Sequence, residues 1–166
     1  MDCFIGLDIG TSAIKGVLLS QNGEIIATES GEFHYSGEKG QYLMEPREFL
    51  RVSLGVLNKL ATWANSQNNI VAICPCCASG NLILLDGEYN PITPIIGWQN
   101  EISQAQLDGY YTENERNAIY KKVGWPVVTG FPIAYLPWLK ENKKELLQNA
   151  RMICMSAEYL IFVLTG

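Results

Sequence analysis

The sequence predicts an α/β protein whose mixed sheet begins with an antiparallel three-stranded meander. Two β-rich runs, residues 4–7 and 14–19, flank a short polar tip, and an Asn22-Gly23 turn leads into a third run at residues 24–28. Farther along the chain, strand-like and helical patterns alternate, which favours a sheet flanked by helices. The length of 166 residues allows one domain, residues 1–166, with a sizeable core.

The remaining elements follow from apolar periodicity and from helix-start and turn residues. Further strands are expected at residues 32–35, 70–74, 82–85, 95–98 and 151–155. The strands at 70–74 and 152–155 should extend the main sheet in parallel. Helices are expected from Pro46 to about residue 67, at 101–122 (two helices broken near Asp108-Gly109), at 133–141, at 143–148 and at 156–164.

Charge and composition exclude some classes of protein. The net charge of −5 argues against non-specific nucleic-acid binding, which requires a basic face. The start of the chain resembles no secretory signal, and no apolar run reaches the roughly 18 residues of a membrane span. Five cysteines cannot all pair with one another. We therefore expect a reduced, cytoplasmic protein that binds neither nucleic acid nor membrane.

Three of the cysteines lie close together, at Cys74, Cys76 and Cys77. Their spacing differs from that of zinc ribbons, and no second cluster of Cys and His completes a set of four ligands. Small buried thiols that line a pocket are the favoured interpretation. The only histidine, His34, is read as a surface or hydrogen-bonded strand residue and not as a catalyst.

The tip of the first hairpin carries groups suited to phosphate. Gly10 lets the backbone approach an anion closely and adopt angles that other residues avoid. Thr11 and Ser12 add hydroxyl donors, and Lys15 adds positive charge. Asp8 would repel a bare phosphate, so its natural use is to hold Mg²⁺ through water. The alternative is a simple turn in which Asp8 and Ser12 only satisfy backbone groups. From these residues alone, both interpretations stay open.

The same segment resembles a known family. Residues 8–15 (DIGTSAIK) resemble the first phosphate motif of the FGGY carbohydrate kinases, which belong to the actin/hexokinase superfamily. Collinear segments resemble further motifs of the family: residues 40–46 its G-W-x-E-x-D-P, 84–99 its L-L-D-x-x-G-x-P-L-x-P-x-I-x-W, 138–142 its W-L-K-E-x, and 158–166 its D-Y-L-x-x-x-L-T-G. The matches run nearly from end to end.

The resemblance implies a ribonuclease H-like (actin-like ATPase) fold, here an incomplete domain similar to the first third of such a kinase. It implies phosphoryl transfer from ATP, with Mg²⁺, to a hydroxyl of a sugar or polyol. Asp8 would organise Mg²⁺ and its waters, and Gly10, Thr11, Ser12 and Lys15 would bind phosphate. The general base and the nucleotide domain would lie in the remaining C-terminal part of the kinase, so the chain alone should be inactive. Formation of a homodimer is left open.

The expected sugar site departs from the family pattern. Ala78 replaces the glutamine of the family's S-G-Q-x-x-G, although Ser79 and Asn81 offer donors nearby. After Trp98 and Gln99, Asn100 replaces the aspartate of W-x-D-x-R, and the arginine is absent. We therefore expect substrate contacts from Ser79, Asn81, Trp98, Gln99 and Asn100, with core packing as the alternative for Trp98. A short non-catalytic, sugar-binding or regulatory relative is the alternative function.

Overall fold

The computed structural model describes residues 1–36, 41–64, 68–102 and 104–166, and the chain divides into two compact units. Unit 1 consists of residues 1–36, 44–78 and 156–166, and unit 2 consists of residues 37–43 and 79–155. Unit 2 is thus mostly one long insertion into the chain of unit 1. No change in composition marks its ends, and for this reason the sequence suggests a single stretch of alternating elements.

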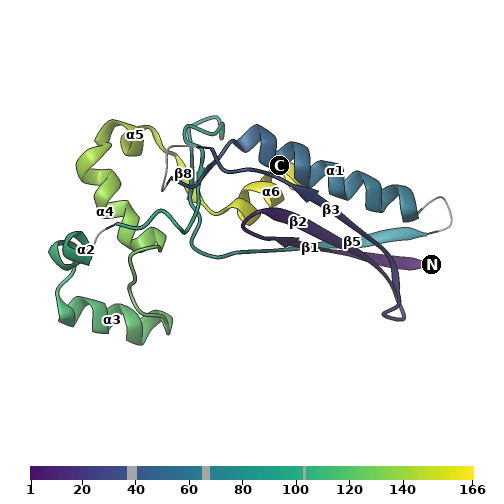
Figure 1. Cartoon of the computed structure of the whole chain (residues 1–166), viewed down its shortest axis with the longest axis horizontal. Coiled ribbons are helices and arrows are strands. Elements are labelled where there is room, and N and C mark those ends of the chain that lie inside the picture. Colours follow the sequence, from purple (N-terminus) through teal and green to yellow (C-terminus); the bar gives the residue numbers. More distant parts are fainter. Residues whose placement is uncertain (37–40, 65–67, 103) are drawn as a thin grey trace. The chain divides into compact units, whose positions relative to one another are not determined.

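Unit 1 is built on a four-stranded mixed sheet with the strand order β3-β2-β1-β5. β1 (Asp2–Ile9), β2 (Ala13–Ser20) and β3 (Ile25–Glu32) form an antiparallel meander, and β5 (Asn69–Cys77) pairs with β1 in parallel (Figure 1). The predicted α/β class, the N-terminal meander and the first parallel strand are therefore confirmed.

One face of this sheet is buried under helices α1 (Pro46–Ala64) and α6 (Ser156–Thr165). Every second residue of β1 points to this face, and Cys3, Ile5, Leu7 and Ile9 are all at most 3% exposed. The apolar stripe of α1 packs against them, and the ring of Phe49 stacks on that of Tyr159 in α6, with centroids 6.4 Å apart. Of the elements that the structure describes in unit 1, none covers the opposite face.

Two expectations for the segment between β3 and α1 change. The strand predicted at residues 32–35 does not form, because β3 itself continues to Glu32, where its partner β2 begins at Ala13. Phe33 then leaves the ladder, donates its amide to the Ser12 carbonyl (3.2 Å) and buries its ring. β4 (Leu43–Met44) is the next strand. The predicted helix end near residue 67 lies outside the described residues, as does Gly40.

β5 is longer than the strand predicted at residues 70–74, since it continues through Pro75 to Cys77. A proline lacks the amide donor that a central strand needs, which argued for a strand end there. β5, however, is the edge strand of this four-stranded sheet, and an edge tolerates the missing donor. Residues 75–77 pair with residues 7–9 of β1 and carry the sheet to the level of the hairpin tip.

Among the described residues, two short strand pairs and four helices involve unit 2, with β4 at the point where the chain passes from unit 2 to unit 1. β6 (Ile83–Leu85) pairs with β8 (Met152–Cys154), and β4 pairs with β7 (Ile95–Ile96). The predicted strand at residues 151–155 therefore exists, but it runs antiparallel to β6 and does not extend the main sheet. The reason is its partner: the Leu85 carbonyl accepts the Arg151 amide, and this pairing holds β8 inside unit 2.

The helices of unit 2 surround two apolar clusters. They are α2 (Gln104–Tyr110), α3 (Glu113–Val123), α4 (Pro132–Asn142) and α5 (Lys144–Asn149). One cluster centres on Leu82, Leu84, Ile96 and Leu139, and the other on Ile102, Leu107, Val127 and Ala134. Two helices do occupy the region 101–122, but the break lies at residues 111–112 and not at Asp108-Gly109. Thr112 and Glu115 form a capping box that starts α3 there.

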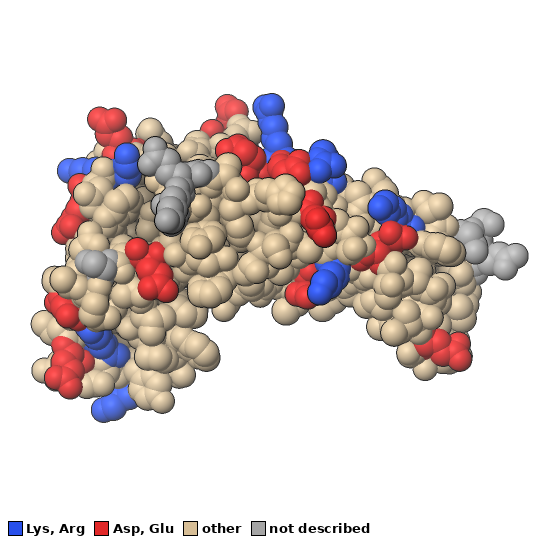
Figure 2. Space-filling model, viewed as in Figure 1, with Lys and Arg blue, Asp and Glu red and all other residues tan. Residues whose placement is uncertain are grey.

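The surface carries charges of both signs. On the face drawn in Figure 2, acidic and basic side chains are interspersed. Among the described residues, no helix has the length and apolar character needed to cross a bilayer.

Candidate functional site

The tip between β1 and β2 is fixed by backbone hydrogen bonds on several sides. The Gly10 amide donates to the Ala13 carbonyl (3.0 Å) and closes the turn. The Ile9 carbonyl accepts the amide of Ala78, which follows β5 (3.0 Å). The Ser12 carbonyl accepts from Phe33, as described above. The tip is therefore a turn that hydrogen bonds hold in place at the ends of β1, β2 and β5, and not a free loop.

The turn leaves little space for a side chain at position 10. Its φ lies outside the left-handed region, contrary to the unusual backbone angles that we expected. A Cβ built there would lie 3.1 Å from the Ala13 carbonyl oxygen, which is closer than ordinary contact. In the part of the chain that the structure describes, the amides of Thr11 and Ser12 have no protein acceptor. Both donors are therefore available to an anion at the tip.

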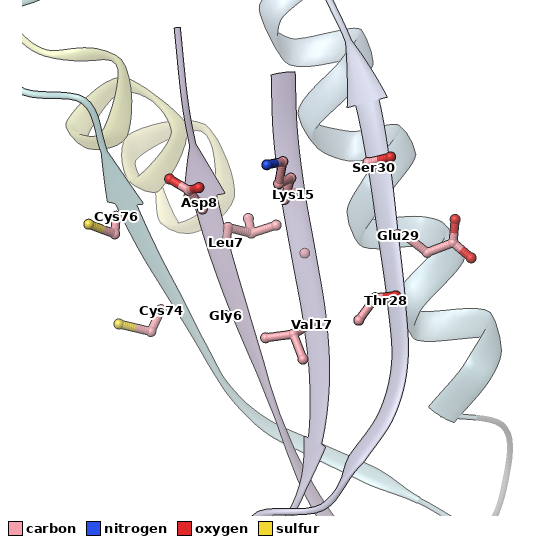
Figure 3. Close-up of a pocket in the computed structure, with 11 residues that line it drawn as sticks. Gly6, Leu7, Asp8, Lys15, Val17, Thr28, Glu29, Ser30, Cys74 and Cys76 are labelled. Atoms are coloured by element: carbon pink, nitrogen blue, oxygen red, sulfur yellow. The ribbon is translucent and has the colours of Figure 1, made fainter. Parts of the chain in front are cut away.

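A polar row crosses the open face of the sheet just below this tip. The strand register sets Cys76, Asp8, Lys15 and Ser30 side by side on β5, β1, β2 and β3. Neighbouring partners in a sheet lie roughly 5 Å apart, so the carboxylate and the ammonium group share one small area. Figure 3 shows the Asp8 and Lys15 side chains extending from adjacent strands toward the same end of the sheet.

Below the polar row, a second row consists of Cys74, Gly6, Val17 and Thr28. The two rows line an open hollow of about 730 Å³ (Figure 3). Gly6 has no side chain, which deepens the floor between its larger neighbours. Glu29 also contributes to the rim, but its carboxylate accepts a hydrogen bond from Trp63 of α1 (2.9 Å) and so belongs to the buried side of the sheet.

The free charges in this hollow are those of Asp8 and Lys15. Both side chains are exposed, and neither has a protein partner among the described residues. Those same residues contain no cluster of three or more acidic, His or Cys side chains that would hold a metal ion by itself. A single free carboxylate fits a hydrated Mg²⁺ that takes its other ligands from water and phosphate, since this ion keeps much of its hydration shell.

The five expected sugar-site residues, Ser79, Asn81, Trp98, Gln99 and Asn100, all lie in unit 2. Gly80 lies between Ser79 and Asn81 in the chain and packs against Trp98. It has φ +89°, and a Cβ there would lie 2.9 Å from the Trp98 Cβ. Trp98 is 43% exposed, so it is a surface residue in this chain and not a core residue. Ser79 is exposed, whereas Asn81 is only 8% exposed.

Both polar atoms of the Asn100 side chain form hydrogen bonds with backbone groups. Its Nδ2 donates to the carbonyls of Tyr42 (2.7 Å) and Gly97 (2.9 Å), and its Oδ1 accepts the Tyr42 amide (3.1 Å). An aspartate, as in the family pattern, has no hydrogens to give these two carbonyls at neutral pH. Asn100 thus ties residue 42 to the turn after β7, and we assign it a positioning role.

This assignment gives a stability prediction. Asn100→Asp should lower the free energy of unfolding by about 1–3 kcal/mol at pH 7, because two carbonyls lose their donor and face a carboxylate instead. The deficit should shrink below the pKa of the new carboxyl group, since the protonated acid can donate one hydrogen bond. The change is measured by urea unfolding followed by circular dichroism, at pH 7 and at a pH below the pKa of the new carboxyl group.

Asn117→Asp, on an exposed face of α3, is the matched control because it makes the same change without those bonds. It should leave the unfolding midpoint nearly unchanged. Equal midpoints for the two variants at pH 7 would contradict the positioning role of Asn100.

The neighbours of Asn100 differ in their surroundings. Glu101 accepts a hydrogen bond from the Thr129 hydroxyl (3.0 Å). Ile102, which stands where the family has arginine, is buried in the second apolar cluster of unit 2. The Oε1 of Gln99 is buried without a hydrogen-bond partner among the described residues, which makes it the most unusual polar atom near the expected sugar site.

Some lining residues of the hollow were not anticipated. Cys74 and Cys76 do line a pocket, but they are exposed and not buried as predicted, because the described elements leave their face of β5 uncovered. Thr28 and Ser30 were missed altogether. The sequence of β3 does not mark them, because their place on this face follows only from the pairing of β3 with β2. His34 is exposed, as expected, but lies outside any strand.

Comparison with known proteins accounts for this arrangement. The pattern described as "FGGY family of carbohydrate kinases, N-terminal domain" matches residues 3–166. The chain belongs to the FGGY family. The "Gluconokinase" of Bacillus subtilis (strain 168) is 26% identical over 157 residues, which cover 94% of this chain and 30% of the relative. The "Xylulose kinase" of Lactococcus lactis subsp. lactis is 27% identical over 168 residues, covering 100% and 33%.

Solved structures of FGGY kinases share the fold. The gluconate kinase from Lactobacillus acidophilus matches with a TM-score of 0.87 and 28% identity over 97% of this chain and 32% of that one. The ligand-bound xylulose kinase from the same organism matches with a TM-score of 0.88 and 27% identity over 98% and 33%. The actin-like ATPase fold expected from the resemblance is therefore confirmed. This FGGY chain spans about a third of the length of these relatives.

Proposed function

We propose that this chain is the N-terminal part of an ATP-dependent carbohydrate kinase, which transfers a phosphoryl group to a hydroxyl of a sugar or polyol. The observation that carries the proposal is the position of Asp8 and Lys15. They lie side by side at the hairpin tip, neither has a protein partner among the described residues, and the chain belongs to the FGGY family. Phosphoryl transfer depends mainly on positioning and charge stabilisation, and a rigid tip with free donors serves both.

On the phosphate side, the residues of the tip have distinct roles. Gly10 lets the phosphates approach the turn closely, and Thr11 and Ser12 donate from their free amides and hydroxyl groups. The Lys15 ammonium attracts the phosphate oxygens from the neighbouring strand. Asp8 would hold Mg²⁺ through water, and the bound ion would neutralise part of the phosphate charge.

On the sugar side, Trp98 offers an exposed aromatic face, and Ser79 offers a hydroxyl group. Asn81 and Gln99 contribute from more buried positions, and Asn100 holds the turn that carries Trp98 and Gln99. The general base and most of the ATP site are assigned to the remaining C-terminal part of the kinase. The proposed location is the cytoplasm, where ATP is available, and formation of a homodimer stays open.

The proposal is tested with a chimera in which residues 1–166 replace the corresponding third of the Lactococcus lactis xylulose kinase. The folded chimera should form ADP from MgATP in the presence of one member of a panel containing xylulose, gluconate, glycerol, and other pentoses, hexoses and polyols. The isolated chain should show negligible turnover with all of them. The measurement is a coupled assay for ADP, in which each sugar or polyol is tested singly and compared with a reaction without it.

The alternative is a non-catalytic sugar-binding or regulatory relative. It predicts a chimera that folds and binds a sugar, as measured by calorimetry, but forms no ADP with any member of the panel. Substantial turnover by residues 1–166 alone would contradict the assignment of the base to the C-terminal part.

A further inference from the structure

Three segments that lie far apart in the sequence meet at Trp98. They are the turn after β5 at residues 79–81, the turn after β7 at residues 97–100, and the loop before α4 at residues 128–131. All three belong to unit 2, so their contacts are internal to one compact unit. The first and the third segments each bring a glycine against Trp98.

Gly80 meets Trp98 where the side chain leaves the backbone. A Cβ built at position 80 would lie 2.9 Å from the Cβ of Trp98, a distance that real Cβ atoms essentially never show. The Cβ position is set by the backbone, so no rotation of the Trp98 side chain relieves this contact. Position 80 also has φ +89°, which L residues rarely adopt. A residue other than glycine at this position therefore displaces either Trp98 or the turn at 79–81.

Gly130 meets the backbone of the same residue. A Cβ built at position 130 would lie 2.5 Å from the carbonyl oxygen of Trp98. Two hydrogen bonds hold this loop against the residues that follow Trp98. The Thr129 hydroxyl donates to the Glu101 carboxylate (3.0 Å), and the Ile102 amide donates to the Thr129 carbonyl (3.4 Å). Retreat of the loop from an added methyl group would strain both bonds.

The indole ring of Trp98 is less enclosed than the backbone that carries it. The residue is 43% exposed, although its Cβ and its carbonyl oxygen lie against the two glycines. Side-chain rotation can turn the ring, but the backbone sets the point from which the ring projects. A misplacement of a binding group by about 1 Å can cost about 100-fold in rate.

We propose that Gly80 and Gly130 are positioning residues for the sugar site, which act by fixing the point from which Trp98 projects. A methyl group at either position displaces Trp98 and so weakens its contact with the sugar. The effect on the sugar rests on the proposed function, in which Trp98 contacts the substrate. The steric contacts do not, so they are tested separately.

The contact between Gly80 and Trp98 is tested on the 166-residue chain by urea unfolding in three backgrounds. Gly80→Ala should lower the unfolding midpoint in the wild-type chain. In the Trp98→Gly background the loss should be clearly smaller, because that variant removes the Cβ that the new methyl group meets. Trp98→Ala removes the ring but keeps the Cβ, so there the loss should equal that in wild type.

Gly124→Ala is the matched control for backbone strain. Gly124 has φ +75°, but nothing lies within 4 Å of a Cβ built there. Its substitution should therefore cost the same in all three backgrounds. For Gly130→Ala the loss should also be equal in all three, because each keeps the carbonyl oxygen of residue 98. Gly87→Ala, which has open space and no positive φ, should cost little.

Equal losses from Gly80→Ala in the Trp98→Gly and Trp98→Ala backgrounds would overturn the proposal, since the turn at 79–81 then moves and Trp98 does not. If Gly80→Ala alone fails to fold, recovery of the fold in the Trp98→Gly background supports the contact, and failure there overturns it. A loss from Gly130→Ala no larger than that from Gly87→Ala would remove Gly130 from the proposal.

The positioning role is measured by the kinetics of the chimera. Gly80→Ala should raise the KM for the sugar by about 10–100-fold and leave the KM for MgATP unchanged. In the Trp98→Ala chimera the same substitution should not change the sugar KM, because no ring is left to misplace. Gly124→Ala should leave both KM values unchanged.

A purely structural role for Gly80 gives a different result. It lowers the fraction of folded enzyme, and thus the apparent kcat, without changing either KM, and that outcome would overturn the positioning role. A chimera that is inactive with every sugar would count against the proposed function. The unfolding experiments would still decide the contact, and sugar affinity measured by calorimetry would take the place of KM.

Discussion

Asp8→Asn in the active chimera is expected to lower kcat by about 10²–10³-fold, the typical cost of removing one well-placed electrostatic group. Asparagine keeps the shape of the side chain and removes the charge that would hold Mg²⁺ and its waters. Because the ion would neutralise charge that develops in the transition state, the loss should fall chiefly on kcat and less on KM. The measurement is steady-state kinetics with the preferred sugar at several Mg²⁺ concentrations.

Asp2→Asn is the matched control, since it removes the same charge from the opposite end of the same strand. It should leave kcat unchanged, and thermal unfolding should be the same for both variants. If Asp8 only satisfies a turn, Asn serves as well, and both variants keep full activity. That outcome would remove the Mg²⁺ role and weaken the roles given to Thr11, Ser12 and Lys15.

The hairpin tip was predictable because its determinants are local. Two β-rich runs, residues 4–7 and 14–19, flank a short polar tip and so predict a hairpin, and the Asn22-Gly23 turn leads into the next strand. Pairing of adjacent strands then places Asp8 beside Lys15. Nothing beyond the first 20 residues is needed for that juxtaposition.

The remaining features of the site depend on partners far away in the chain. Cys76 lies beside Asp8 only because β5 continues past Pro75 in its pairing with β1. The role of Asn100 depends on Tyr42, 58 residues earlier. The exposure of Cys74 depends on which face the helices cover. A single sequence carries little information about such long-range choices.

The close packing of α1 against the sheet gives the last prediction. Leu60 is fully buried, and its Cδ1 would lie 2.6 Å from a Cβ added at Gly16 on β2. Leu60→Ala should lower the free energy of unfolding by about 2–5 kcal/mol, because it removes buried methyl groups and leaves a cavity. Gly16→Ala should cost about 1–3 kcal/mol through overpacking.

The double variant tests whether these two residues define the spacing between helix and sheet. Truncating Leu60 removes the nearest atom that the methyl group added by Gly16→Ala would strike, so the combined loss should be smaller than the sum of the single losses. Val56 remains 2.8 Å from the added Cβ, so the compensation should be partial. The measurement is urea unfolding of the four proteins, with Lys59→Ala on the exposed side of α1 as the control. Strictly additive losses would show that α1 moves away from the sheet to admit the methyl group, and that the glycine at position 16 is not required by the contact with Leu60.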